Sequence, residues 1–287
     1  DLIADQPEAA RHLLWEPLCI AALNTSAMTA SAVVFVEILR RAFSGHPRAS
    51  DLLIPRVDLS VLLPEPALIE VGEYGNDVFL STPVTKVMPN ESGVAVVTNQ
   101  SAQFFDRVVI ATGPQHVSRL LETEPTAAPL VHALRELSYE PITTFHFEFV
   151  CATPDIDISS PMFMLDGEPG QWLFWQRRSN GQWRASVVIS AHHRNDTDTV
   201  LSSKALAQLR RSYQLPDPVW FRAITEKRAT YSCTPAQTRL LASLPKKIGQ
   251  LMLAGDWCVP ELPATLEAAV ISGENAAKSI INDVRYG

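Results

Sequence analysis

The chain has 287 residues, of which 46% are hydrophobic and 19% are charged; this composition supports a sizeable core and excludes disordered and fibrous proteins. Lysine and arginine number 24 against 31 aspartate and glutamate residues, and the net charge of -7 argues against nucleic acid as a partner. The length allows one or two domains.

The first seventy residues are predicted to be helical. Apolar residues recur at helical spacing over residues 8–23 and 29–43, and the polar cluster Asn24–Ser26 predicts a break between these two helices. The uncharged stretch Leu18–Val36 contains this break. We therefore expect two packed helices there and no membrane-spanning segment.

Short strands are predicted after residue 76. The expected strands cover residues 77–81, 84–88, 93–98 and 104–111, and a helix is expected to begin near Gln115. The apolar run Val108–Ala111 is typical of a strand that is buried on both faces.

A second strand-rich region is predicted over residues 142–226. Phe145, Phe147 and Phe149 alternate with polar residues, further strands are expected at 171–176 and 183–191, and a helix is expected at 200–213. Two interpretations remain open for the aromatic residues of this region, which either line an apolar tunnel or fill the core. They are Trp172, Phe174, Trp175, Phe145 and Phe147.

The last segment predicts a ligand-binding unit of strand, loop and helix, with the strand at 250–254 and the helix at 265–283. Gly255 would let a ligand approach the backbone, and Asp256 would accept hydrogen bonds from its hydroxyl groups. Thr265 stands at the expected N-cap, which leaves the backbone N–H groups of Leu266 and Glu267 free for an electron-rich group. Small residues are expected to form a close-packing face of this helix; they are Ala269, Gly273, Ala276 and Ala277.

The four cysteines are widely spaced and form no C-x-x-C pair. We therefore expect neither a metal site nor a disulfide framework, and a reducing, cytoplasmic compartment.

The string from Leu253 to Ala277 resembles the carboxyl-terminal FAD motif of the flavin-containing amine oxidase superfamily, which includes the phytoene desaturases. Strings at 14–25 and 50–60 resemble the hydroxysqualene dehydroxylase, or squalene-associated desaturase, subgroup, and matches at 104–113 and 226–230 extend the resemblance along the whole chain. The family's G-x-G-x-x-G turn has no counterpart here, and Ala268 replaces the usual glycine. The chain is therefore expected to be the carboxyl-terminal part of a longer protein, and to be inactive by itself.

The resemblance assigns FAD contacts residue by residue. Val84 corresponds to the residue that meets the adenine ring. The loop beside the pyrophosphate and ribose corresponds to Ala111, Thr112 and Gly113. Gly255 and Asp256 correspond to the ribityl and pyrophosphate contacts, and the segment near the isoalloxazine corresponds to Thr265, Leu266 and Glu267.

The resemblance implies reductive dehydroxylation of hydroxysqualene to squalene, with FAD as cofactor and NAD(P)H as an external reductant. A carotenoid-type desaturase or an amine oxidase is the alternative activity, and an apolar-ligand-binding or dimerising fragment without catalysis is the alternative of another class. An apolar isoprenoid substrate, peripheral contact with the cytoplasmic face of the membrane and self-association of the chain are also expected.

Three residues are candidates for catalysis, each with a plain structural alternative. Glu16 is either a buried acid above the substrate or a solvated helix residue. Lys227 and Arg228 either lie near the flavin or a leaving group, or form a surface ion pair.

The expected fold is a mixed α/β one with a discontinuous FAD-binding domain. Residues 76–121 and 246–287 are assigned to that domain. Helices over 1–75 and a mostly antiparallel sheet over 122–245 are assigned to the substrate domain.

Overall fold

The chain folds into two units, each assembled from segments that are far apart in the sequence. The computed structural model describes residues 2–151, 162–192 and 198–286. The first unit comprises Asp1–Val36, Glu136–Leu244 and Asp256–Ile271, and the second comprises Glu37–Arg135, Pro245–Gly255 and Ser272–Gly287. The unit boundaries place residues 37–75 and 122–135 in the second unit, whereas the sequence-based division placed them in the substrate domain.

The first unit begins with a continuous helical stretch, as predicted. It consists of α1 (Glu8–Ala10), the π-helical turn η1 (Arg11–Trp15) and α2 (Glu16–Leu23). It ends at Asn24, which has the left-handed conformation (φ 45°) common at helix C-termini. Helix α3 (Ala32–Phe43) starts three residues later than predicted, because residues 26–30 form a hydrogen-bonded turn closed by the Ser26 carbonyl oxygen.

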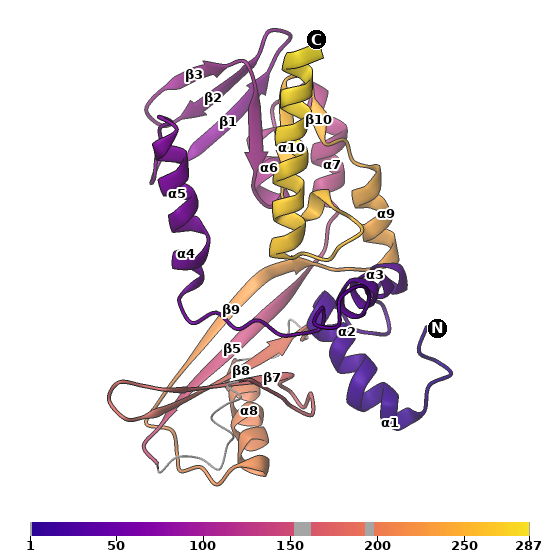
Figure 1. Ribbon diagram of the computed structural model, residues 1–287, viewed down its shortest axis with the longest axis vertical. Coiled ribbons are helices and arrows are strands. Elements are labelled where there is room, and N and C mark those ends of the chain that lie inside the picture. Colours follow the sequence, from indigo (N-terminus) through magenta and orange to yellow (C-terminus); the bar gives the residue numbers. More distant parts are fainter. Residues whose placement is uncertain (1, 152–161, 193–197, 287) are drawn as a thin grey trace. The chain divides into compact units, whose positions relative to one another are not determined.

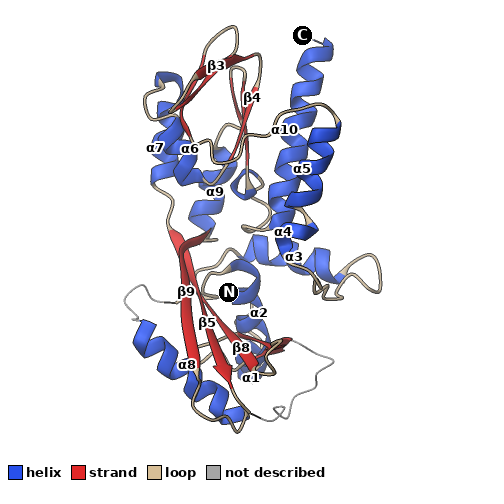
Figure 2. Ribbon diagram, turned by 90° about the vertical axis from the view of Figure 1, so that its left-hand side faces the viewer, coloured by secondary structure: helices blue, strands red, loops and turns tan. Residues whose placement is uncertain are grey.

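A five-stranded antiparallel sheet forms the centre of the first unit. Its order is β6-β7-β8-β5-β9, and Figure 2 shows β5, β8 and β9 beside α8 (Asp198–Ser212). The strands are β5 (Tyr139–Phe149), β6 (Met162–Met164), β7 (Trp172–Arg177), β8 (Trp183–Ser190) and β9 (Trp220–Tyr231). Leu201, Ala205 and Leu209 of α8 pack on one face of the sheet and bury its aromatic side chains.

The alternation of side chains along these strands resolves the two interpretations of the aromatic residues. Phe145, Phe147 and Trp175 point towards α8 and are buried in the core. Trp172 and Phe174 stand at the intervening positions of β7 and are only half-buried. Core packing therefore explains three of the five, and the other two lie on the opposite face of the sheet.

The second unit contains two three-stranded sheets. One is the antiparallel sheet of β1 (Val84–Pro89), β2 (Val94–Thr98) and β3 (Ala102–Phe105). The other has the order β10-β11-β4 and consists of β4 (Val108–Ala111), β10 (Lys247–Ile248) and β11 (Leu251–Ala254). The helices that lie wholly in this unit, labelled in Figure 1, are α4 (Leu59–Leu62), α5 (Pro64–Glu73), α6 (Pro114–Leu120) and α7 (Ala128–Arg135). The 3-10 turn η2 (Pro125–Ala127) precedes α7.

The remaining elements follow β9 and β11 in the chain. They are α9 (Pro235–Ser243) and the 3-10 turn η3 (Asp256–Cys258) in the first unit, and α10 (Leu266–Tyr286), which passes from the first unit into the second after Ile271. None of the helices in the described ranges is long and apolar enough to cross a membrane.

Three sequence-based predictions were wrong in the second unit. Residues 77–81 form no strand, since they pair with no described strand and Ser81 has a positive φ of 53°. The predicted strand 104–111 is two strands, β3 and β4, which belong to different sheets. Only Ile110 of β4 is buried, because the opposite face of the strand, which carries Val109 and Ala111, is exposed.

The predicted small-residue face of α10 was correct at Ala276 and wrong at Gly273 and Ala277. The buried residues are Ala268, Ser272 and Ala276, spaced by four residues, while Gly273 and Ala277 are exposed. Ala276 packs against Met252 and Ala254 of β11. The small side chain of Ala276 thus allows α10 to approach β11 closely, which is the contact predicted from the sequence.

Candidate cofactor site

Two parallel strands of the second unit end side by side. Strand β11 pairs with β4 in a register that places Ala254 opposite Ala111. Thr112 and Gly255 are therefore the first residues beyond the carboxyl ends of neighbouring parallel strands. Ligands of open α/β sheets bind at this edge, so the register supports the assignment of both residues to one site.

Gly255 adopts a conformation that other residues rarely take. Its φ is 144°, and its backbone N–H donates a hydrogen bond of 2.8 Å to Ser272 Oγ on the buried side of α10. A side chain at this position would be strained whatever space surrounds it. The glycine predicted from the sequence is thus required by the turn itself.

The loop after β4 presents a buried polar atom. Gly113 is the N-cap of α6, and a Cβ atom at this glycine would lie 2.9 Å from Gln115 Oε1. That oxygen is buried and has no hydrogen-bond partner among the described residues. A buried acceptor of this kind is costly unless it is satisfied, and a hydroxyl or amino group of a ligand would satisfy it.

Val84 lies on the other sheet of the same unit. It is the first residue of β1 and pairs with Thr98 of β2. Helix α6 packs against β1, so the strand that begins at Val84 adjoins the helix that follows Gly113.

Asp256 follows Gly255 directly and is the first residue of the first unit's η3 turn. Its Oδ1 accepts a hydrogen bond of 2.8 Å from the backbone N–H of Trp257, whose side chain is fully buried. Burial raises the pKa of the Asp256 carboxyl above its usual value, against the lowering effect of the backbone hydrogen bonds. The carboxylate keeps further acceptor capacity for hydroxyl groups.

Thr265 caps α10, as predicted. Its Oγ1 accepts a hydrogen bond of 3.2 Å from the backbone N–H of Ala268 and donates to the carbonyl oxygen of Pro263. The side chains of Leu266 and Glu267, which begin the helix, are exposed. These residues therefore present the first turn of a 21-residue helix at the surface of the first unit.

Tyr231 was missed by the sequence reasoning. Its hydroxyl donates a hydrogen bond of 2.9 Å to the carbonyl oxygen of Leu262, and its ring is buried. This bond ties the end of β9 to the loop that joins Asp256 to Thr265. Burial is the largest of the causes that raise the pKa of Tyr231, so the hydroxyl stays protonated as a donor. The string Tyr231-Ser232-Cys233 has no periodicity that would have revealed this role.

The three catalytic candidates lie in different environments. Glu16 Oε2 is 2.8 Å from His12 Nδ1 on the same helical stretch, and the side chain of His12 is 57% exposed. Lys227 and Arg228 are both exposed, and the guanidinium carbon of Arg228 lies 5.5 Å from the centre of the Tyr139 ring. The surface ion pair considered for Lys227 and Arg228 is absent from the ion pairs of the described residues. Nor does the part of the chain that the structure describes contain a group of three metal-ligating side chains.

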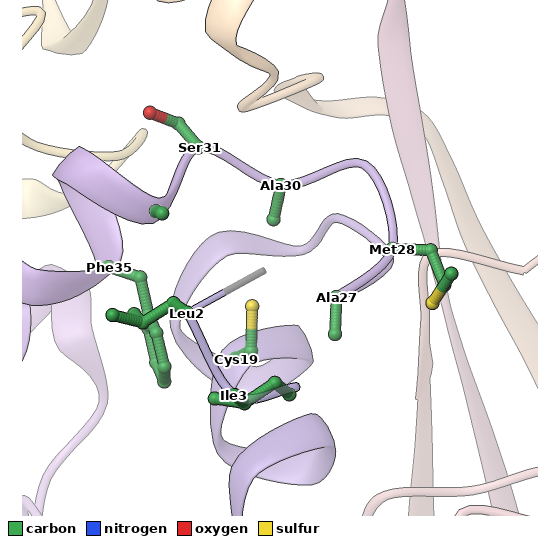
Figure 3. Close-up of a pocket in the computed structure, with 9 residues that line it drawn as sticks. Leu2, Ile3, Cys19, Ala27, Met28, Ala30, Ser31 and Phe35 are labelled. Atoms are coloured by element: carbon green, nitrogen blue, oxygen red, sulfur yellow. The ribbon is translucent and has the colours of Figure 1, made fainter. Parts of the chain in front are cut away.

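A pocket of about 80 Å³ opens in the first unit, and its lining includes none of the three catalytic candidates. Figure 3 shows Cys19 of α2, Met28 of the following turn and Phe35 of α3 among its lining side chains. Pockets for small organic ligands are typically about 300–1,000 Å³. This pocket is therefore too small to hold a long isoprenoid.

The sequence profile described as flavin containing amine oxidoreductase matches residues 64–281. The chain belongs to this family. The expected superfamily is thus confirmed, and so is the mixed α/β fold.

Curated relatives of this chain in the flavin-containing amine oxidoreductase family share one name. Proteins named hydroxysqualene dehydroxylase from Rhodopseudomonas palustris and Sinorhizobium fredii are both 28% identical to this chain, over 92% and 94% of its length. A third, from Zymomonas mobilis, is 26% identical over 96%. The aligned regions cover 61%, 62% and 64% of these relatives, so the chain spans about three fifths of their length.

Solved structures of two oxidases and of another oxidoreductase show the same fold. A single-site variant of putrescine oxidase matches 98% of this chain and 66% of its own with a TM-score of 0.71 and 18% identity. Cyclohexylamine oxidase from Brevibacterium oxydans matches 97% of this chain and 65% of its own, with a TM-score of 0.67 and 14% identity. An oxidoreductase from Methanosarcina mazei matches 96% and 66%, with a TM-score of 0.72 and 10% identity.

Proposed function

We propose that the protein that carries this chain is an FAD-dependent oxidoreductase that removes the hydroxyl group of hydroxysqualene and releases squalene. The observation that carries this proposal is the similarity of more than nine tenths of the chain to three proteins that share the name hydroxysqualene dehydroxylase. The membership of a flavin-containing family supports FAD as the cofactor.

The described residues fit FAD. Gly255 has no side chain to block a ligand where two parallel strands end, and Gln115 Oε1 is a buried acceptor that requires a donor. The half-buried Asp256 carboxylate suits the ribityl hydroxyls, because an acceptor with little access to water binds hydroxyl donors well. Ala111, Thr112, Gly113 and Val84 would hold the adenosine and phosphate part, and Thr265, Leu266 and Glu267 would border the isoalloxazine.

The net reaction defines what the protein must do. Replacement of C–OH by C–H consumes one hydride and one proton and releases water, so each turnover uses two electrons, for which we propose NAD(P)H as the external source. Bound FAD, in its reduced form, supplies the hydride. The chain's own tasks are to orient the cofactor and to keep water from the carbon that loses its hydroxyl group.

Apolar side chains on the open face of the first unit's sheet suit an isoprenoid. Trp172, Phe174 and Ile224 stand on the face opposite the core and are half-buried or exposed. We place the hydrocarbon chain of the substrate against them, since contact with an alkene chain removes apolar area of both partners from water. Because such a substrate dissolves in lipid, we also propose loose contact with the cytoplasmic face of the membrane.

The test is a product assay with the purified full-length protein. Under anaerobic conditions with a reductant, hydroxysqualene is expected to disappear as squalene appears, measured by gas chromatography and mass spectrometry. Desaturation of phytoene, or oxidation of an amine, in place of this conversion would overturn the proposed substrate and direction.

A matched pair of variants tests the cofactor site. Asp256→Ala is expected to weaken FAD binding roughly ten- to a hundredfold, since hydrogen bonds to a charged group contribute about 1.5–3 kcal/mol. Glu16→Ala removes a carboxylate that is paired with His12 and is expected to leave the FAD content unchanged. Equal FAD retention in both variants would contradict the assignment of Asp256.

A further inference from the structure

Strand β9 carries a bulge at the point where it faces Pro141. Glu140 of β5 pairs with Thr230, and Ile142 pairs with Glu226, so three residues of β9, from 227 to 229, stand opposite one residue of β5. Proline has no backbone N–H and cannot donate to the ladder. The backbone pairing of β5 with β9 is therefore interrupted at Pro141. Bulges of this kind redirect side chains next to functional sites.

The bulge turns the side chain of Arg228 onto an aromatic ring. The guanidinium carbon lies 5.5 Å from the centre of the Tyr139 ring, and the backbone N–H of Arg228 donates a hydrogen bond of 3.1 Å to Glu226 Oε1. None of the ion pairs among the described residues includes the Arg228 guanidinium. A ring holds the cation in place without neutralising it, so the charge stays available to an anionic ligand.

Tyr139 connects this cation to the cofactor motif. It pairs with Tyr231 across the two strands, and Tyr231 is bonded through its hydroxyl to Leu262 in the Asp256–Thr265 loop. The electrostatic surroundings agree with this placement. Burial raises the pKa of Tyr139 most, Arg228 lowers it, and the Asp256 carboxylate raises it, so both charges lie within reach of the phenol.

We propose that Arg228, held over the Tyr139 ring by the bulge opposite Pro141, is the cation that stabilises the negative charge of the reduced isoalloxazine. This assignment rests on the proposed FAD-dependent function. Tyr139 is the positioning residue that acts through Arg228. Lys227, the neighbour in the same bulge, is exposed as Arg228 is, but no cation–π contact among the described residues involves it, and we assign it no part in the site.

The readout is the two-electron midpoint potential of FAD bound to the full-length protein. Arg228→Met is expected to lower the preference for reduced over oxidised flavin roughly three- to tenfold, which corresponds to a potential about 15–30 mV more negative. Arg228→Lys should recover part of the loss. Lys227→Met is the matched control, because it removes an adjacent charge of the same sign, and its potential should equal that of the unmodified protein.

Variants of Tyr139 test the role of the ring. Tyr139→Phe keeps the ring and is expected to retain the potential, whereas Tyr139→Leu should shift it in the same direction as Arg228→Met. An unchanged potential in Arg228→Met, or an equal shift in Lys227→Met, would overturn the assignment. FAD binding with an Arg228-dependent potential, but no squalene formed, would contradict only the proposed reaction. A protein that binds no FAD would overturn both.

Discussion

Asp256 illustrates how a binding residue lowers the stability of the fold. Because burial raises the pKa of its carboxyl in the folded state, the folded protein binds a proton more tightly than the unfolded chain. The free energy of unfolding therefore falls as the pH rises from about 4, the model-peptide value, through the raised pKa of the folded state. Such a destabilised carboxylate is typical of a functional site.

Asp256→Asn is expected to remove this pH dependence. The amide keeps an oxygen that can accept from the Trp257 N–H and carries no charge to desolvate. The free energy of unfolding at pH 7 should rise relative to the unmodified protein, and the gain should shrink towards pH 4. Urea unfolding at the two pH values measures it, and a gain of the same size at both would contradict the stated cause.

Asn24 lies at the end of α2 and joins three parts of the first unit. Its Nδ2 donates to Thr230 Oγ1 at 2.9 Å, its Oδ1 accepts from the backbone N–H of Ala191 at 2.8 Å, and its φ is 45°. The neighbouring Thr25 Oγ1 accepts from the backbone N–H of Cys233. The Asn24-Thr25 string that resembles the subgroup thus has a structural role in fixing α2 against the sheet.

Substitutions of Asn24 should separate its two roles. Asn24→Gly keeps the ease of a positive φ but loses the hydrogen bonds, and is expected to lower the free energy of unfolding by about 1–3 kcal/mol. Asn24→Ala should lower it further, because alanine also resists the left-handed conformation. Denaturant unfolding compares them, and an alanine variant more stable than the glycine variant would be the opposite of this expectation.

At the scale of elements, the two faces of the five-stranded sheet differ in what they contribute. Phe145→Ala is expected to lower the free energy of unfolding by about 3–5 kcal/mol, because it opens a cavity in a fully buried core. Phe174→Ala, on the half-buried face, should cost less than half as much and should raise the KM for an apolar substrate. Equal losses of stability in the two variants, with an unchanged KM, would show that both faces are core.

The alternation of Phe145, Phe147 and Phe149 could be predicted, because successive side chains of a strand point to opposite faces of the sheet and this pattern is visible in the local sequence. The Thr265 cap and the Gly255 turn could be predicted for the same local reason. The Arg228 bulge could not, since it depends on the pairing of β9 with β5 some eighty residues earlier. The one local hint was Pro141 within a strand.

The buried stripe of α10 shows a different limit of sequence reasoning. Residues 268–277 contain small side chains on two adjacent helical rows, and periodicity alone does not choose between them. The contact of Ala276 with Met252 and Ala254 of β11 selects the row of Ala268 and Ser272. The split of residues 104–111 into β3 and β4 was likewise decided by partners in two different sheets.

At the scale of the whole molecule, the chain passes between the two units five times, after residues 36, 135, 244, 255 and 271. Neither unit is a continuous segment, and helices α3 and α10 each run from one unit into the other. Because the segments of the two units alternate along the chain, neither unit can form without the chain passing through the other. We therefore expect the units to unfold in one cooperative transition.

The positions of the tryptophan and cysteine residues allow the cooperativity of unfolding to be measured. All six tryptophans and all four cysteines belong to the first unit, whereas circular dichroism reports the helices of both. Tryptophan fluorescence and circular dichroism should therefore give the same urea midpoint. Burial raises the pKa of Cys19 to about 11 and that of Cys233 to about 12, so both thiols should resist labelling at pH 7 and react only in that transition. A fluorescence and labelling transition that precedes the loss of helical signal would show that the first unit unfolds alone.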